Sequence, residues 1–269
     1  HTRIENRVNA IAKQIHCGNI YVNRNQIGAI VGSQPFGGEG LSGTGPKAGG
    51  PNYLSMFVNR TQNTTDLDQV APLVPNLQNT LHAWRGIGID LEFEAQSYVN
   101  AFVRLTHLYD PSQIPGQDNL FRYQFKLPIL VLAFDGFDPK DLAKIHLALR
   151  ICGAPFEIKV AGDPQSLDKV SVTHAVNPSA VEEAWPPLVE SGHFKHVRVL
   201  GNPPDSLYEK AARNARCVDT TSVLVGLAEL KKYALEQSIC IDYHRYGHLG
   251  LRERSLNSVL GPVTIERPA

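Results

Sequence analysis

The spacing of apolar residues predicts a chain that alternates helices and strands over most of its length. Near the start, four apolar residues recur on one helical face: Ile4, Val8, Ile11 and Ile15. A second helical pattern comprises Leu91, Ala95, Tyr98, Phe102 and Leu105. The near-continuous apolar run at 129–134 instead predicts a strand that is covered on both faces.

Helix start and stop signals define the elements that follow this strand. Asp138 before Pro139 predicts an N-cap and a first helical residue, and Gly153 predicts the end of that helix near residue 151. Asn177 before Pro178 predicts a second start of this kind. The pattern also predicts strands at 156–161, at 196–200 and near Cys217, and helices at 206–214 and 223–236. This alternation predicts an α/β fold, a Rossmann-like open parallel sheet with helices on both faces.

The sequence divides into four consecutive parts. Residues 1–60 contain a helix, a short strand at 19–23 and a glycine-rich loop, and residues 61–80 form a polar linker. Residues 81–236 form the Rossmann-like domain, and 237–269 form a tail in which 238–243 alternate like a strand. Because the chain opens inside a helix that needs a packing partner, we expect a piece of a longer protein; the resemblance described below implies that it is a C-terminal piece.

Charge and cysteine content exclude several classes of function. The 26 basic and 26 acidic residues balance, so no overall field attracts nucleic acid or an anionic membrane. The four cysteines, Cys17, Cys152, Cys217 and Cys240, show neither disulfide nor metal-site spacing. We therefore expect reduced cysteines, no metal site and a cytoplasmic protein.

The glycine-rich loop carries the strongest signal in the sequence. Its glycines are at positions 28, 32, 37, 38, 40, 43, 45, 49 and 50. So many glycines predict positive φ angles or a close approach of the backbone to something bound. A flexible surface loop fits less well, because Ile30, Val31 and Phe36 are interspersed among the glycines. The dinucleotide-like and phosphate-loop-like spacings around Lys47 are incomplete, so Lys47 is predicted to be structural or solvent-facing.

Residues 18–25, 34–38 and 42–50 resemble the end of the catalytic domain in the aldehyde dehydrogenase superfamily. The resemblance is closest to the glutamate-semialdehyde (pyrroline-5-carboxylate) dehydrogenase part of the proline utilization A family. It implies that the backbone of Gly28 and Ala29 binds the α-carboxylate of the aldehyde substrate, while Phe36 packs against the aliphatic stem. Paired N–H groups are suitable carboxylate donors, and neither Gly28 nor Ala29 carries a side chain that would block them.

The resemblance also implies the activity of the parent protein. Members of this family oxidise proline with FAD and then oxidise glutamate γ-semialdehyde with NAD. In the family the nucleophilic cysteine, the general base and most of the NAD site lie upstream of the present segment. None of the four cysteines here has a basic partner at a helix N-terminus, so we expect no catalytic residue, no bound cofactor and no activity in this fragment alone.

The larger part of the chain, from about residue 80, looks like the extra C-terminal domain of long family members. The acidic side chains of Asp135 and Asp138 follow its first strand and would repel a pyrophosphate, so no dinucleotide site is expected. For the tail, the resemblance implies a segment that completes a sheet of the dehydrogenase domain and covers an internal path. The alternative is a last edge strand. Asp242, His244 and Arg245 are adjacent rather than convergent and are not predicted to be catalytic.

The expected partners follow from the same resemblance. They are the remainder of the polypeptide, with its proline dehydrogenase and NAD-binding domains, and a small-molecule substrate of the parent. Homo-oligomer formation and a peripheral membrane position of the parent stay open. The alternatives from other classes are a free-standing non-catalytic interaction module and a nucleotide-binding domain.

Overall fold

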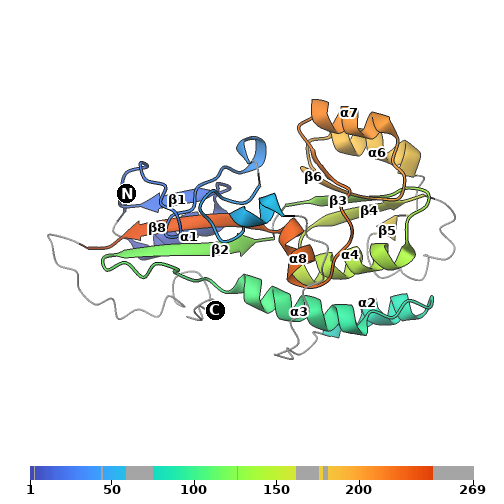
Figure 1. Cartoon of the computed structure of the whole chain (residues 1–269), viewed down its shortest axis with the longest axis horizontal. Coiled ribbons are helices and arrows are strands. Elements are labelled where there is room, and N and C mark those ends of the chain that lie inside the picture. Colours follow the sequence, from blue (N-terminus) through green and yellow to red (C-terminus); the bar gives the residue numbers. More distant parts are fainter. Residues whose placement is uncertain are drawn as a thin grey trace. The chain divides into compact units, whose positions relative to one another are not determined.

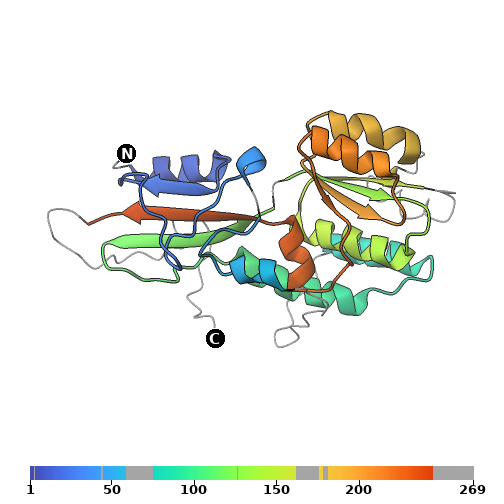
Figure 2. The ribbon, with the colours of Figure 1, turned by 45° about the horizontal axis from the view of Figure 1, so that its top comes forward.

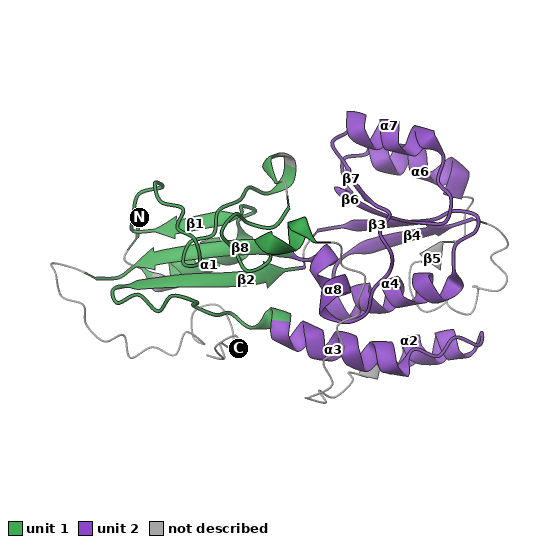
Figure 3. Cartoon of the chain, in the orientation of Figure 1, with its two compact units in different colours: residues 1–60, 105–124, 235–269 green, residues 61–104, 125–234 purple. Residues whose placement is uncertain are grey.

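The chain forms two compact units, each made of segments that are distant in sequence (Figure 3). The computed structural model describes residues 1–2, 4–43, 45–58, 75–125, 127–161, 176–177 and 181–244. Unit 1 comprises 1–60, 105–124 and 235–269, and unit 2 comprises 61–104 and 125–234. The sequence prediction divided the chain into consecutive domains. The compact units instead assign 105–124 and the strand at the start of the tail to the same unit as the N-terminal loop.

Unit 1 is built on a three-stranded sheet with the order β1-β8-β2 (Figure 1). Its strands are β1 (Asn19–Val22), β2 (Gln117–Gln124) and β8 (Leu235–Asp242). The central strand β8 runs parallel to β1 and antiparallel to β2. Cys240 lies opposite Tyr21 on one side and opposite Asn119 on the other. The last described strand of the chain thus lies between two strands that precede it by more than 100 residues.

Helix α1 (Glu5–Gln14) confirms the predicted N-terminal helix but not its buried face. The apolar cluster of this unit contains Ala12 and the strand residues Val22, Leu120, Ile239 and Ile241. Of the four residues on the predicted apolar face, only Val8 packs against this cluster, whereas Ile4, Ile11 and Ile15 are exposed. The periodicity identified a helix, but it did not identify which side of that helix packs on the sheet.

Strand β8 also overturns the helix predicted at 223–236. The structure has a short helix α8 (Leu227–Leu230), a 3-10 turn η4 (Lys231–Tyr233) and then the strand. Pairing with β2 along the whole of β8 fixes an extended backbone from Leu235, and this tertiary constraint overrides local helical preference. Strand β2 was not predicted from the sequence.

Unit 2 confirms the predicted Rossmann-like fold. Its described part contains a five-stranded, all-parallel sheet with the order β5-β4-β3-β6-β7. The strands are β3 (Ile129–Ala133), β4 (Phe156–Val160), β5 (Val176–Asn177), β6 (His196–Leu200) and β7 (Cys217–Asp219). The helices are α2 (Pro75–Arg85), α3 (Glu92–Thr106), α4 (Pro139–Cys152), α6 (Val181–Glu190) and α7 (Asp205–Arg213). Helices α6 and α7 cover one face of the sheet, and α4 and α2 lie on the other (Figures 1 and 2).

The predicted caps of α4 are confirmed. The Asp138 side chain accepts a hydrogen bond from Lys140 N at 2.8 Å, and Gly153 ends the helix with φ +65°. For the second predicted helix start, Asn177 is the last residue of β5, and the next described helix begins at Val181. Pro178 lies outside the described residues. In the part of the chain that the structure describes, no helix is long and apolar enough to cross a membrane.

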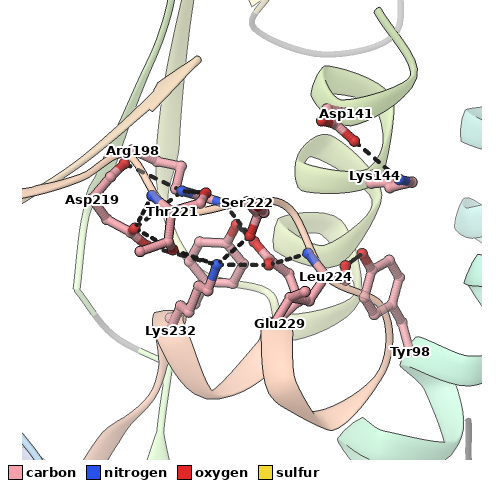
Figure 4. A network of polar contacts seen from close by, with 11 residues as sticks. Tyr98, Asp141, Lys144, Arg198, Asp219, Thr221, Ser222, Leu224, Glu229 and Lys232 are labelled. Carbon is pink, nitrogen blue, oxygen red and sulfur yellow. Dashed lines mark hydrogen bonds and ion pairs between the residues drawn. The ribbon is translucent and has the colours of Figure 1, made fainter. Parts of the chain in front are cut away.

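A buried ionic network holds the end of this sheet to α8 (Figure 4). Arg198 on β6 is fully buried, and its Nη1 lies 3.1 Å from Asp219 Oδ1 and 2.6 Å from the Thr221 carbonyl oxygen. Its Nη2 lies 3.5 Å from Oε1 of the fully buried Glu229. Glu229 also lies 3.1 Å from Lys232 Nζ. A buried charge of this kind depends on its partners, because solvent cannot replace them.

We therefore expect Arg198→Met to lower the free energy of unfolding of unit 2 by about 3–5 kcal/mol, because it leaves Glu229 with too few counter-charges. Both tryptophans of the chain, Trp84 and Trp185, lie in unit 2, so urea unfolding followed by tryptophan fluorescence reports this unit. Arg213→Met is the matched control, since its side chain is 79% exposed, and it should change stability by less than about 0.5 kcal/mol. Equal midpoints for the two variants would contradict the role of the network.

Candidate functional site: the anchor loop

The residues predicted to bind substrate lie on one folded loop of unit 1, residues 23–50, which we call the anchor loop. Two short antiparallel bridges shape it, Ile30 with Gln34 and Phe36 with Ala48. Gly28 and Ala29 precede the first bridge, and Phe36 lies on the second. The prediction of positive φ angles is confirmed at several glycines, among them Gly28 at +135°.

A polar cluster holds the two arms of the anchor loop on β1. Asn19 Nδ2 donates to the Pro35 carbonyl oxygen at 2.8 Å, and its Oδ1 accepts from Gly37 N at 3.1 Å. Lys47 Nζ donates to the Gly37 carbonyl oxygen at 2.6 Å and to Asn19 Oδ1 at 3.1 Å. Because the Lys47 side chain is 2% exposed, the structural prediction for this residue holds and the solvent-facing one is wrong.

Strand β8 fixes the far end of the same loop. Glu236 Oε2 accepts from Lys47 N at 2.7 Å, and its Oε1 accepts from Asn52 Nδ2 at 2.5 Å. Asn52 Nδ2 also donates to the hydroxyl oxygen of Tyr123 on β2, at 2.5 Å. Carboxylate acceptors make strong hydrogen bonds, so the Glu236 side chain of β8, which we call the tail strand, holds both Lys47 and Asn52 in place.

The predicted binding groups face outward. Ala29 is exposed, Gly28 is half-buried and Phe36 is 52% exposed. Within the described ranges, no hydrogen bond occupies the backbone N–H of Gly28 or of Ala29. Two N–H donors, one on a half-buried residue and one on an exposed residue, therefore have no hydrogen-bond partner within the described ranges. An exposed aromatic ring lies on the same loop.

Two residues that the sequence did not single out lie beneath Gly28. The amide of Gln34, which is 0% exposed, lies between the Gly28 carbonyl oxygen and the Arg24 guanidinium. With its nitrogen toward Gly28, Nε2 donates to the Gly28 oxygen at 2.6 Å and Oε1 accepts from Arg24 Nη1 at 2.8 Å. The reverse orientation sets oxygen against oxygen at Gly28 and donor against donor at Arg24. Its one hydrogen bond is from Nε2 to Asn119 Oδ1 at 3.1 Å, an oxygen that Oε1 faces in the first orientation. The first orientation satisfies both amide atoms.

Arg24 is in turn held by the tail strand. Its Nη1 lies 2.9 Å from Cys240 Sγ and 3.7 Å from Asp242 Oδ1, and its side chain is 14% exposed. No sequence pattern indicated these contacts, because Arg24 lies more than 200 residues from Cys240 and Asp242 and meets them only through the pairing of β1 with β8. Arg24 and Gln34 lie in the segments that resemble the family, but their residue types alone predicted neither the groups that they contact nor the direction of their side chains.

Comparison with known proteins finds relatives of the segment that contains the anchor loop. The aldehyde dehydrogenase family matches residues 1–62. The bifunctional protein PutA of Salmonella typhimurium is 51% identical over 89 residues, which are 31% of this chain and 7% of that protein. The 1-pyrroline-5-carboxylate dehydrogenase of Bacillus licheniformis is 51% identical over 57 residues, 21% of this chain and 11% of that protein.

A solved structure extends the likeness beyond the loop. The structure of proline utilization A (PutA) from Corynebacterium freiburgense matches with a TM-score of 0.66 and 25% identity, and the match covers 92% of this chain. The chain is related to proline utilization A. It spans only 23% of that structure, and about 7% of the length of the Salmonella PutA relative.

The four cysteines of this PutA-related chain are poor candidates for a nucleophile. Burial raises the pKa of each thiol, and for Cys17 the nearby carboxylate of Glu39 raises it further. Arg24 opposes this effect at Cys240 without reversing it. Because the thiolate is the reactive form, a raised pKa disfavours attack on an aldehyde near neutral pH.

The Rossmann-like unit does not offer a dinucleotide cradle where the fold would place one, after β3. The first backbone N–H groups of a helix usually receive a pyrophosphate, but at α4 the Asp138 carboxylate already accepts from Lys140 N. A phosphate placed there would face that negative charge. The residues at this turn therefore do not fit NAD. No group of three potential metal ligands occurs among the described residues either.

The buried Lys47 gives a test of the loop structure. Burial lowers the pKa of its ammonium from 10.5 to about 8, against the raising influence of Glu236, Cys17 and Glu39. Between these two values the unfolded chain binds more protons than the folded one, so this group increases the free energy of unfolding as the pH rises through that window.

We expect the Lys47 Cε resonance, followed by carbon-13 NMR, to titrate near pH 8. In Lys47→Arg the pH-dependent gain in stability between pH 8 and 10.5 should disappear, since a guanidinium stays charged there. A titration midpoint at the ordinary lysine value would show that Lys47 does not occupy this buried position.

Proposed function

We propose that the chain is the C-terminal part of a bifunctional PutA-type enzyme that converts proline to glutamate. In that enzyme one part oxidises proline with FAD and another oxidises L-glutamate γ-semialdehyde with NAD. The present chain supplies the anchor for the aldehyde substrate, through Gly28, Ala29 and Phe36. The observation that carries the proposal is the pair of N–H groups at Gly28 and Ala29 that have no acceptor within the described ranges, on a loop in the segment that matches the aldehyde dehydrogenase family.

The chemistry of the substrate suits these groups. Glutamate γ-semialdehyde carries an α-carboxylate, and a carboxylate that accepts hydrogen bonds from two backbone N–H groups gains about 1.5–3 kcal/mol from each. At Gly28 the φ of +135° lies in a region open to glycine and unfavourable for other residues, so the loop can bring its backbone close to a ligand. The exposed ring of Phe36 offers an apolar surface for the substrate's methylene groups.

Unit 2 and the tail serve assembly and covering rather than catalysis in this proposal. The raised thiol pKa values and the occupied N-terminus of α4 support a non-catalytic role. The nucleophile, the general base and the NAD and FAD sites would belong to the remainder of the polypeptide. NAD, when bound there, accepts the hydride from the substrate carbon, while the residues of this chain bind and orient the substrate.

We expect this chain alone to produce no NADH from glutamate semialdehyde, whereas a protein extended upstream through the dehydrogenase domain should produce it. The reason is the absence of an activated thiol among the four cysteines of this chain. NADH absorbance gives the rate. Turnover by the short chain would show that one of these cysteines acts as a nucleophile and would contradict the proposed division of labour.

In the extended protein, we expect Gly28→Ala to lower kcat/KM for glutamate semialdehyde about 10- to 100-fold, mainly through KM, because the added methyl strains the backbone that carries the donors. Butanal has no carboxylate, so its kcat/KM should change less than about twofold. Gly32→Ala is the matched control, since Gly32 also has a positive φ, +82°, and open space around an added Cβ. Equal losses for the two aldehydes would contradict carboxylate anchoring at Gly28.

A further inference from the structure

The hydrogen bond from Gln34 fixes the direction of the peptide that links Gly28 to Ala29. Gln34 Nε2 holds the Gly28 carbonyl oxygen at 2.6 Å, on the buried side of the anchor loop. No cis peptide bond occurs in the described chain, and in a trans peptide the C=O and the following N–H point in opposite directions. The N–H of Ala29 must therefore point away from Gln34, toward the exposed side of the loop.

The same contacts make that N–H a stronger donor. Arg24 Nη1 donates to the oxygen of the Gln34 amide, whose nitrogen donates to the carbonyl of Gly28. Each hydrogen bond in such a chain polarises the next, and the low dielectric around a fully buried amide strengthens the effect. The positive charge of the guanidinium thus polarises the Gln34 amide, which in turn polarises the Gly28–Ala29 peptide and its N–H group.

We propose that Gln34 and Arg24 are positioning residues for carboxylate binding. Gln34 orients the Gly28–Ala29 peptide, and Arg24 polarises it from beneath. This inference rests on the proposed function. It attributes part of the affinity and specificity for the carboxylate to Gln34 and Arg24. Neither side chain touches the substrate.

The arrangement suits an amino-acid aldehyde in particular. Its α-carboxylate has an α-ammonium group on the same carbon, and a lysine or arginine head beside the carboxylate would also repel that ammonium. Arg24 is kept below the loop, 3.7 Å from Asp242 Oδ1, and its side chain is 14% exposed. The carboxylate therefore meets neutral N–H donors that have been strengthened at a distance, and the ammonium meets no exposed cation from this pair of residues.

The first test uses the free, isotope-labelled chain and needs no ligand. We expect NMR to detect a scalar coupling across the hydrogen bond between Gln34 Nε2 and the Gly28 carbonyl carbon. The absence of this coupling in a spectrum that shows others of the same kind would overturn the inference, whatever the chain binds.

The second test is a titration of the same chain with L-glutamate and with 4-aminobutanoate, which lacks the α-carboxylate. In the wild-type chain the Gly28 and Ala29 amide resonances should shift and saturate with L-glutamate only. Gln34→Met should weaken this binding about tenfold or more, because the loss of a charge-polarised hydrogen bond releases the peptide. Gln26→Met is the matched control on an exposed glutamine of the same loop and should bind as the wild type does.

A second variant covers the case in which Gln34→Met fails to fold. Gln34→Glu keeps the size and still accepts from Arg24, but its carboxylate cannot donate to the Gly28 oxygen, so it should also lose binding. Wild-type binding of L-glutamate by either folded variant would overturn the role of Gln34 alone. No response of Gly28 and Ala29 in the wild-type chain, with the coupling present, would instead overturn the carboxylate anchor and this inference with it.

Discussion

The structure of unit 1 depends on one set of backbone hydrogen bonds, those that place β8 between β1 and β2. Strand β8 spans Leu235–Asp242, close to the end of the described chain, and it pairs in parallel with Asn19–Val22 near the beginning. Closing a loop of more than 200 residues has an entropic cost that grows slowly with length. The pairing must offset this cost: β8 pairs with β2 along its whole length and with β1 over residues 238–241, so its central backbone groups have partners on both sides.

The side chains of β8 contact the anchor loop and the residues next to it, so the pairing of β8 also fixes the position of the loop. Glu236, at one end of the strand, holds the backbone of Lys47 and the amide of Asn52. Cys240 and Asp242, toward the other end, hold Arg24, which in turn binds the amide beneath Gly28. Side chains alternate across a strand, so a shift of register by one residue would turn these groups to the opposite face of the sheet. The position of the tail strand therefore sets the geometry of a site on the first 50 residues.

Most of unit 2 could be predicted from the sequence because the signals for its helices and strands lie in neighbouring residues. The cap at Asp138, the helix end at Gly153 and the apolar strand at 129–134 each depend on neighbouring residues, and the structure agrees with them. The predicted helix at 223–236 was wrong because β2, which fixes β8 as a strand, lies more than 100 residues away in the sequence.

In the candidate site, too, local features could be predicted from the sequence and contacts between separate residues could not. Glycine at position 28 and its positive φ could be predicted from residue type, whereas the contact of Gln34 with Gly28 could not. Likewise, the burial of Lys47 follows from the positions of Asn19 and Gly37 on the folded loop, which no local spacing encodes. What the sequence missed are contacts that form only in the folded loop and sheet, and in our proposal these contacts orient the groups that it did identify.

The central claim is that the backbone of Gly28 and Ala29 receives the α-carboxylate of the substrate, and a crystal structure with L-glutamate bound tests it most directly. We predict that the α-carboxylate oxygens lie within about 3.2 Å of the nitrogens of Gly28 and Ala29, with the methylene groups against the ring of Phe36. A glutamate bound elsewhere, with these two N–H groups hydrogen-bonded to the protein itself, would contradict the account.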